Sequence, residues 1–171
     1  MKNFPIVNPE DNKEYWISRA IAVVVIFTAV DKSGDKYILA VQRGSGTPDP
    51  EFIGSYCLPC GYLDYNETCV EAAARELKEE TGIEAPISAF ELIAINDNPY
   101  SDKRQNVTFR YKVHCNTSVE ELRDLITDKF SEEDEVSSIE FISLADIEEY
   151  KWAFNHKELI KGIYDNINIR H

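Results

Sequence analysis

The sequence predicts an α/β fold, an α/β/α sandwich with a central mixed sheet. Strand-like and helix-like segments follow one another in the order strand, strand, helix, strands, helix, which is typical of this architecture. The long, largely β-branched run at 19–30 is typical of a central strand. The chain of 171 residues has no repeat, low-complexity tract or linker, so we expect one domain over residues 1–171.

The first part of the chain is expected to be rich in strands. Residues 1–18 contain Pro5 and Pro9 and are expected to form an irregular lead. The composition of residues 31–35 predicts a turn, so the strands on either side of it form a hairpin. The other elements expected here are a strand at 36–42, a loop at 44–50 and a short extended segment at 52–58.

A helix is expected over residues 67–81, because this segment is rich in Ala, Leu, Glu, Lys and Arg and has no internal Gly or Pro. Gly82 stands where a left-handed residue would end the helix. The side expected to face a core consists of Val70, Ala73, Ala74, Leu77 and Thr81. The later elements expected are strands at 87–96, 105–115 and 136–142, helices at 119–129, 144–150 and 156–168, and loops at 97–103 and 131–135.

The chain is strongly acidic, with a net charge of −13 and a pI of about 4.6. This charge argues against a nucleic-acid or membrane partner bound through a basic surface. It does not exclude phosphorylated small molecules, because a bound metal ion reverses the local sign. The longest apolar run, 20–27, is too short to span a bilayer, and the first residues lack the apolar core of a signal peptide. A cytoplasmic location is therefore expected.

Four cysteines are present, and reduced thiols are expected in the cytoplasm. Cys57 and Cys60 form a CxxC motif, which is found in zinc sites and in redox pairs. A zinc site needs two further ligands, and the sequence has no second CxxC and no HxxxH. Cys69 and Cys115 could be recruited only by the fold. The alternative is that the CxxC pair consists of two packed thiols.

An acidic face is predicted on the helix at 67–81. At 100° per residue, Glu76, Glu79 and Glu80 fall within an arc of about 100°, where their charges repel one another. A solvated acidic face is one explanation. The other is a divalent cation, since a hard ion such as Mg²⁺ takes carboxylate oxygens, keeps several waters and takes its remaining ligands from substrate phosphates.

The stretch from Gly61 to Ile83 resembles the Nudix box, written G-x5-E-x7-R-E-U-x-E-E-x-G-U with U a bulky apolar residue. Its fixed positions are all matched, by Gly61, Glu67, Arg75, Glu76, Leu77, Glu79, Glu80, Gly82 and Ile83. The resemblance implies a Nudix fold with a loop-helix-loop catalytic motif and hydrolysis of a pyrophosphate bond. Such linkages resist attack because their oxygens are negatively charged, so cations and a base that activates water are needed.

The resemblance also implies a metal site. Residues that match Glu76, Glu79 and Glu80 bind Mg²⁺ or Mn²⁺ in similar enzymes, and a backbone carbonyl near Gly61 commonly helps. Glu67 is expected at the start of the helix, where the helix dipole favours a carboxylate and where it can orient the later ligands.

Arg75 is expected to orient the glutamates through charge-assisted hydrogen bonds, and a surface ion pair is the alternative. The general base in similar enzymes is sometimes a box glutamate, here Glu76 or Glu79, and sometimes a glutamate on a later loop. Glu135 lies on the expected loop. It is also one of four acids in the run 132–135, for which a solvated charge cluster is the alternative.

One position next to the box departs from the pattern. Similar proteins often read Leu-Pro-Gly-Gly, whereas this chain has cysteine at position 60. Because Cys60 carries a Cβ, its backbone cannot readily take angles that only glycine tolerates. The departure concerns the placement of the carbonyl near Gly61 and leaves the carboxylates untouched.

The substrate is expected to be a nucleoside diphosphate derivative. Pro99, beyond the box, resembles the ADP-ribose pyrophosphatase subgroup, whereas Tyr100 resembles the diadenosine polyphosphate subgroup. Selectivity is usually carried by loops outside the box. The residues considered for substrate binding are Arg43, Lys103 and Arg104 for phosphate, and Tyr100, Phe52 and Tyr56 for stacking on a base.

These observations favour ADP-ribose or a nucleotide sugar as the substrate. One alternative is a house-cleaning enzyme that hydrolyses (d)NTPs. Another is a non-catalytic sensor, because some similar proteins bind ADP-ribose and regulate transcription; those typically have degenerate boxes or an added DNA-binding domain. The resemblance also allows a homodimer, since similar enzymes that cleave ADP-ribose are often dimers.

Overall fold

The computed structural model describes most of the chain: residues 3–100, 104–126 and 134–167. Strand β3 (Ile21–Val30) lies at the centre of its sheet and is mostly buried, as its apolar and largely β-branched sequence predicts. It pairs in parallel with β8 (Val107–Ser118) and antiparallel with β4 (Lys36–Arg43) and β6 (Cys60–Tyr62). The central mixed sheet expected from the sequence is confirmed.

The sheet has seven strands. Its remaining members are β5 (Tyr56–Cys57), β7 (Phe90–Asn96) and β9 (Val136–Ser143). β3 and β4 pair only close to their hairpin; further along, β4 pairs with β5 and β9, whereas β3 pairs with β6 and β8. The β5–β6 connection spans this divergence, where the amide of Val25 donates to the carbonyl of Pro59 over 2.8 Å.

Helix α1 (Cys69–Thr81) follows β6 and carries the acidic residues of the box. A capping box opens it, because the hydroxyl of Thr68 accepts from the amide of Glu71 and the Glu71 carboxylate accepts from the amide of Thr68. Gly82 ends it at a φ of 73°, as expected for a left-handed cap. The predicted start at residue 67 was two residues early, because Thr68 rather than Glu67 caps the helix.

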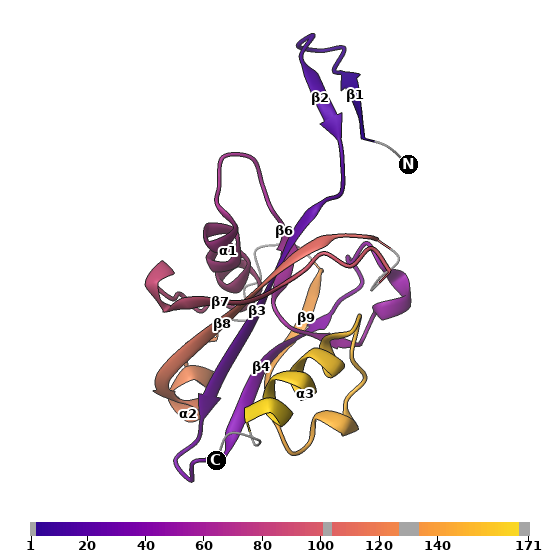
Figure 1. Ribbon diagram of the computed structural model, residues 1–171. Coiled ribbons are helices and arrows are strands. Elements are labelled where there is room, and N and C mark those ends of the chain that lie inside the picture. Colours follow the sequence, from indigo (N-terminus) through magenta and orange to yellow (C-terminus); the bar gives the residue numbers. More distant parts are fainter. Residues whose placement is uncertain (1–2, 101–103, 127–133, 168–171) are drawn as a thin grey trace.

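Helices cover both faces of the sheet, so the molecule has three layers (Figure 1). Alternate side chains of β3 point to opposite faces. On one face Val23, Val25 and Phe27 pack with residues of α1 and of α2 (Val119–Arg123). On the other face Val24 and Ile26 pack with residues of α3 (His156–Ile167). This arrangement confirms the predicted α/β/α sandwich.

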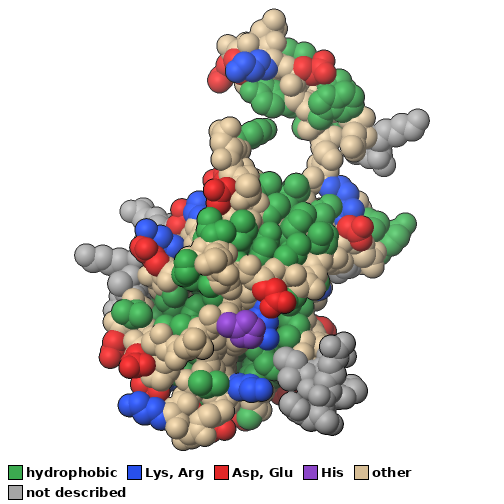
Figure 2. Space-filling view, turned by 60° about the vertical axis from the view of Figure 1, so that its left-hand side comes forward, with side chains coloured by type: hydrophobic (Ala, Val, Ile, Leu, Met, Phe, Trp, Pro, Cys, Tyr) green, Lys and Arg blue, Asp and Glu red, His purple; other side chains and the backbone are tan. Residues whose placement is uncertain are grey.

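The expectation of an irregular lead at residues 1–18 was wrong. The structure has a two-stranded hairpin there, formed by β1 (Phe4–Val7) and β2 (Glu14–Ile17) and pairing Pro5 opposite Trp16. Both strands of an isolated ribbon are edges, where proline is tolerated, so Pro5 does not prevent pairing. The hairpin stands away from the body and carries exposed hydrophobic side chains (Figures 1 and 2).

Several predicted boundaries also shift, because short 3-10 turns replace parts of the expected strands and helices. These turns lie at Pro50–Phe52, Ile87–Ala89 and Ile147–Glu149. Helix α2 ends at Arg123, earlier than predicted, and residues 127–129 of that prediction lie outside the described residues. Within the described part of the chain, no helix is both long and apolar enough to cross a membrane.

Candidate active site

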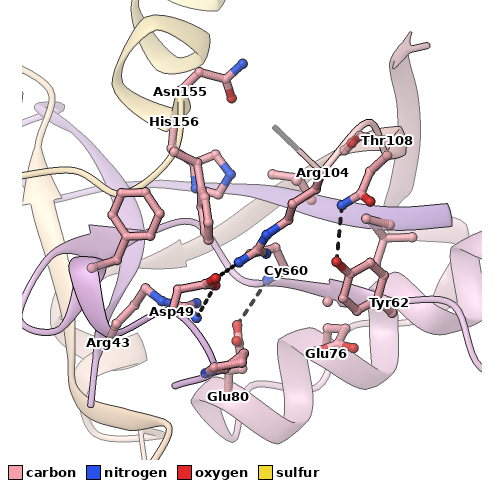
Figure 3. Close-up of a pocket in the computed structure, with 18 of the residues that line it drawn as sticks. Arg43, Asp49, Cys60, Tyr62, Glu76, Glu80, Arg104, Thr108, Asn155 and His156 are labelled. Atoms are coloured by element: carbon pink, nitrogen blue, oxygen red, sulfur yellow. Dashed lines mark hydrogen bonds and ion pairs between the residues drawn. The ribbon is translucent and has the colours of Figure 1, made fainter. Parts of the chain in front are cut away.

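A cleft of about 710 Å³ opens where β3 and β4 diverge. One wall comes from the box: Gly61 on β6, and Glu76 and Glu80 on α1. The opposite wall carries Arg43 and Arg104, with the start of α3 above them (Figure 3). A volume of this size is within the usual range for a site that encloses a small organic ligand.

The box wall depends on close packing between β6 and α1. A Cβ added to Gly61 would lie well within 3.0 Å of the carboxylate oxygens of Glu76, so only glycine allows this approach. Glu80 is fixed from the same strand, since its Oε2 accepts from the amide of Cys60 over 3.1 Å. Both carboxylates therefore take their positions from the backbone of residues 60 and 61.

Arg75 connects the remaining acidic residues of the box. Its guanidinium donates to Glu67 over 2.9 Å, to Glu76 over 2.8 Å, to Glu79 over 2.9 Å and to the carbonyl of Tyr62 over 2.9 Å. The hydrogen bonds from Arg75 lower the pKa of Glu67, and the pKa of Arg75 is raised in return, first of all by Glu67. Glu67 precedes the helix rather than starting it.

Burial raises the pKa of the Glu80 carboxyl well above its usual range, and the nearby Cys57 and Glu76 raise it further. The Glu80 side chain as a whole is partly exposed, but its carboxylate lies deep among protein atoms. The pKa depends on the surroundings of the carboxylate, so burial dominates it. No lysine or arginine of the described ranges forms an ion pair with it. A buried carboxylate of this kind is stabilised when a cation shares its site.

The fit of a metal ion can be judged from these donors. Glu76, Glu80 and Gly61 line the cleft, and carboxylate and carbonyl oxygens suit a hard divalent cation. Glu79 faces Arg75 and does not line the cleft. Accordingly, no three His, Cys, Asp or Glu side chains of the described residues are already gathered as metal ligands. The residues facing the cleft fit such an ion in chemical character, and Arg75 holds part of the set.

The opposite wall is cationic and aromatic. The guanidinium carbons of Arg43 and Arg104 lie 5.2 Å and 5.3 Å from the ring centroid of Phe154, within cation–π range. Asp49 pairs with both arginines, and the ring of Phe52 lies 4.8 Å from that of Phe154. Phe154 has a φ of 56°, which is costly for a bulky residue and is maintained by its surroundings. Neither Phe154 nor Asp49 was predicted from the sequence as a site residue.

His156 lies at the start of α3 and was also missed. Its Nδ1 accepts from the amide of Leu58 over 3.0 Å, so the proton of the neutral ring is on Nε2. Burial lowers its pKa to about 3, and Arg110 and Arg43 contribute to this. The imidazole is therefore neutral near pH 7. The hydrogen bond from the Leu58 amide gives His156 a structural role, because it holds the β5–β6 connection in place.

The remaining candidates are distributed unequally. Glu135 lines the cleft. Its carbonyl accepts from the amide of Gly44 over 2.7 Å, and this segment packs so closely on Gly44 that a side chain there would collide with Asp134. Tyr100 lies outside the cleft lining and is 92% exposed. Tyr56 also lies outside it and bonds to Glu140. Lys103 is outside the described residues.

A family model described as the NUDIX domain matches residues 18–163. The chain belongs to the Nudix family. Nudix hydrolases generally use divalent metals, and this protein is a pyrophosphohydrolase of the Nudix type.

Among curated proteins, the ADP-ribose pyrophosphatase of Methanocaldococcus jannaschii is 30% identical over 158 residues, which cover 91% of this chain and 80% of the relative. The Nudix chain also has the fold of the NUDIX domain of Shewanella oneidensis NrtR solved with ADP ribose. The TM-score is 0.70 at 23% identity, and the match covers 94% of this chain and 93% of that one.

A structure of Shewanella oneidensis NrtR with a 27mer DNA gives a TM-score of 0.63 at 23% identity. That match covers 86% of this chain and 61% of the NrtR chain, so part of NrtR has no counterpart in the match.

Proposed function

We propose that this Nudix enzyme hydrolyses the pyrophosphate bond of ADP-ribose or of a closely related nucleoside diphosphate sugar, with Mg²⁺ or Mn²⁺ as its cation. The observation that carries the proposal is the opposition of two walls in one cleft. Carboxylates of Glu76 and Glu80 face a pair of arginines, Arg43 and Arg104, stacked on an aromatic ring. A cation and a diphosphate can therefore occupy the same cleft in a chain of net charge −13.

The cation would be held by Glu76 and Glu80, with Glu79 and the carbonyl of Gly61 as further donors. When bound, it would neutralise charge on the diphosphate and lower the pKa of an attacking water. Glu79 joins this set only when it turns from Arg75 toward the cleft. Arg75 acts as a positioning residue in this proposal, because one guanidinium holds Glu67, Glu76 and Glu79 together.

The base is assigned to Glu135, with Glu76 or Glu79 as the alternatives. Glu135 lines the cleft from outside the box, and the fixed backbone contact between Gly44 and residue 135 places it there. A carboxylate that is not shared with the cation remains able to accept a proton from water.

Binding of the substrate is assigned to Arg43 and Arg104, whose guanidinium groups match phosphate oxygens. Phe52 and Phe154 lie beside them and offer apolar surface to the adjoining nucleoside or sugar. The name of the Methanocaldococcus jannaschii relative supports ADP-ribose as the first substrate to be tested. Tyr100 would reach a substrate only from its exposed loop.

The test is a substrate screen with purified protein and Mg²⁺ or Mn²⁺, covering ADP-ribose, nucleotide sugars, diadenosine polyphosphates and (d)NTPs. We expect ADP-ribose to be among the fastest substrates. Glu80→Gln and Glu79→Gln should each lower turnover about 100-fold with the fold retained, because they remove charge from the cation site. Glu91→Gln, on the exposed face of β7, is the matched control and should keep full activity.

Hydrolysis that survives both box substitutions would refute the site. Faster turnover of (d)NTPs would favour a house-cleaning enzyme. Binding of ADP-ribose without cleavage of any compound would favour a sensor.

A further inference from the structure

The two cysteines of the CxxC motif lie side by side at the edge of the cleft. Cys57 ends β5 and is fully buried, whereas Cys60 begins β6 and lines the cleft (Figure 3). Both side chains belong to one packed cluster with Val41 and Ala153. Nη1 of Arg43 lies 3.9 Å from the sulfur of Cys57. The proposed reaction does not use either thiol.

The backbone around the pair is held from both sides. Cys57 pairs with Val41 of β4, and Cys60 pairs with Val24 of β3. Between them, the carbonyl of Pro59 accepts from Val25 and the amide of Leu58 donates to His156. Because these contacts fix the connection, the two side chains stay in one packed cluster without an ordering cost at the moment of reaction.

A zinc site is the first alternative for such a pair. Among the residues that the structure describes, however, no third His, Cys, Asp or Glu completes a ligand cluster with the two thiols. Two adjacent thiols without further ligands can still react with a disulfide by exchange.

We propose that Cys57 and Cys60 form a reversible intramolecular disulfide and that this bond lowers catalytic activity. The oxidant is a low-molecular-weight disulfide such as glutathione disulfide. One thiolate of the pair attacks one sulfur of the oxidant and expels a thiolate. The thiolate of the other cysteine then attacks this protein sulfur and expels the second thiolate. Two protein thiols are oxidised and one oxidant molecule is reduced to two thiols.

The link to activity runs through the backbone of Cys60. A disulfide bond is only about 2.05 Å long, so closing it draws the Cys60 side chain toward Cys57. The Cys60 amide donates to Glu80, and the next residue, Gly61, packs against the Glu76 carboxylate. A shift of residue 60 therefore disturbs both carboxylates of the box wall. This part of the inference rests on the proposed function, whereas formation of the disulfide does not.

The test uses full-length protein with Cys69→Ser and Cys115→Ser, so that only the pair remains, and repeats each measurement on the wild type. Samples are equilibrated in glutathione buffers of increasing disulfide content, alkylated and analysed by mass spectrometry. Hydrolysis of ADP-ribose is assayed in parallel. Hydrogen exchange of peptides that contain Cys60 reports the loss of the hydrogen bond from the Cys60 amide to Glu80, and this measurement needs no substrate.

We expect both thiols to become resistant to alkylation together, with a loss of two hydrogen atoms from the intact mass. Turnover should fall about tenfold or more and recover with dithiothreitol, and exchange at Cys60 should become faster. A pair that stays reduced in excess glutathione disulfide would overturn the inference, as would a stable glutathione adduct on Cys60 alone. A disulfide that leaves turnover and exchange unchanged would overturn the link to Glu80. If the reduced protein hydrolyses no substrate, the proposed function is refuted. Alkylation and hydrogen exchange then still test whether the disulfide forms and whether it breaks the hydrogen bond to Glu80.

Discussion

Gly61 shows how a single residue determines the geometry of the site. Its lack of a side chain lets β6 approach α1 so closely that the Glu76 carboxylate occupies the space a Cβ would need. The neighbouring residue, Cys60, holds Glu80 through its amide. Consecutive backbone positions therefore place the two acidic groups that face the cleft. The glycine of the motif is explained by this contact rather than by a special φ angle.

Gly61→Ala should lower turnover about 100-fold, because a methyl group at this position displaces the Glu76 carboxylate by a distance comparable to the 1 Å misplacements that have such effects. Urea unfolding should show a much smaller change in stability, since the carboxylate can move toward the cleft. Gly162→Ala on α3 is the control, because nothing lies within 4 Å of a Cβ added there. Wild-type turnover in Gly61→Ala would contradict the packing argument.

Individual elements contribute unequally to the site. The divergence of β3 and β4 forms the cleft, and the β5–β6 connection and α1 supply its acidic wall. Among the residues that the structure describes, β1 and β2 pair only with each other. Isolated hairpins are marginally stable in water. Where the hairpin joins the body, Arg19 donates to the carbonyls of Asp97 and Asn106, each over 2.7 Å.

Removal of residues 1–17 should change the free energy of unfolding by less than about 1 kcal/mol, because the hairpin adds little to the core of the body. Arg19→Ala in the full chain should cost more, about 1.5–3 kcal/mol, since it removes charged hydrogen bonds to loop carbonyls. Urea unfolding followed by fluorescence measures both changes. A large loss on truncation would indicate that the hairpin packs on another surface, and sedimentation of both proteins would test the predicted homodimer.

At the scale of the whole molecule, acidic residues dominate the charge while the cleft gathers arginines. Arg43, Arg104 and Arg110 all line it, although the net charge is −13. Burial together with Arg110 and Arg43 keeps His156 neutral. The arginines that suit a phosphate therefore also help to lower the pKa of His156, and this shift makes the stability of the fold depend on pH.

The pH dependence of stability follows from the pKa of His156, which is about 3 in the fold against 6.5 as its ordinary value. Between these values the unfolded chain binds the proton and the folded chain does not. The contribution of His156 is thus complete above pH 6.5 and is lost as the pH falls toward 3, by about 1.4 kcal/mol per pH unit. His156→Asn, which can still accept from Leu58, should show a smaller slope in urea titrations from pH 7 to 4. Equal slopes would contradict the assignment.

The sequence determined those features that neighbouring residues encode. The central strand, the helix of the box and its end at Gly82 follow from apolar runs, helix propensity and a left-handed cap, all of which are local. The contiguous Nudix box likewise identified the family and the acidic residues. The β1–β2 hairpin was not predicted, because Pro5 and Pro9 indicate an irregular segment and the sequence does not show that both strands are edges, where proline is tolerated.

Only the tertiary structure decided which residues share the cleft. Arg43, Glu135 and Phe154 lie far apart in the chain and meet because β4 pairs with β9 and the chain then returns to β5. Strand register and loop packing depend on contacts between distant segments, which local propensity does not specify. For the same reason Tyr100, close to the box in sequence, lies outside the cleft, whereas His156 lies within it.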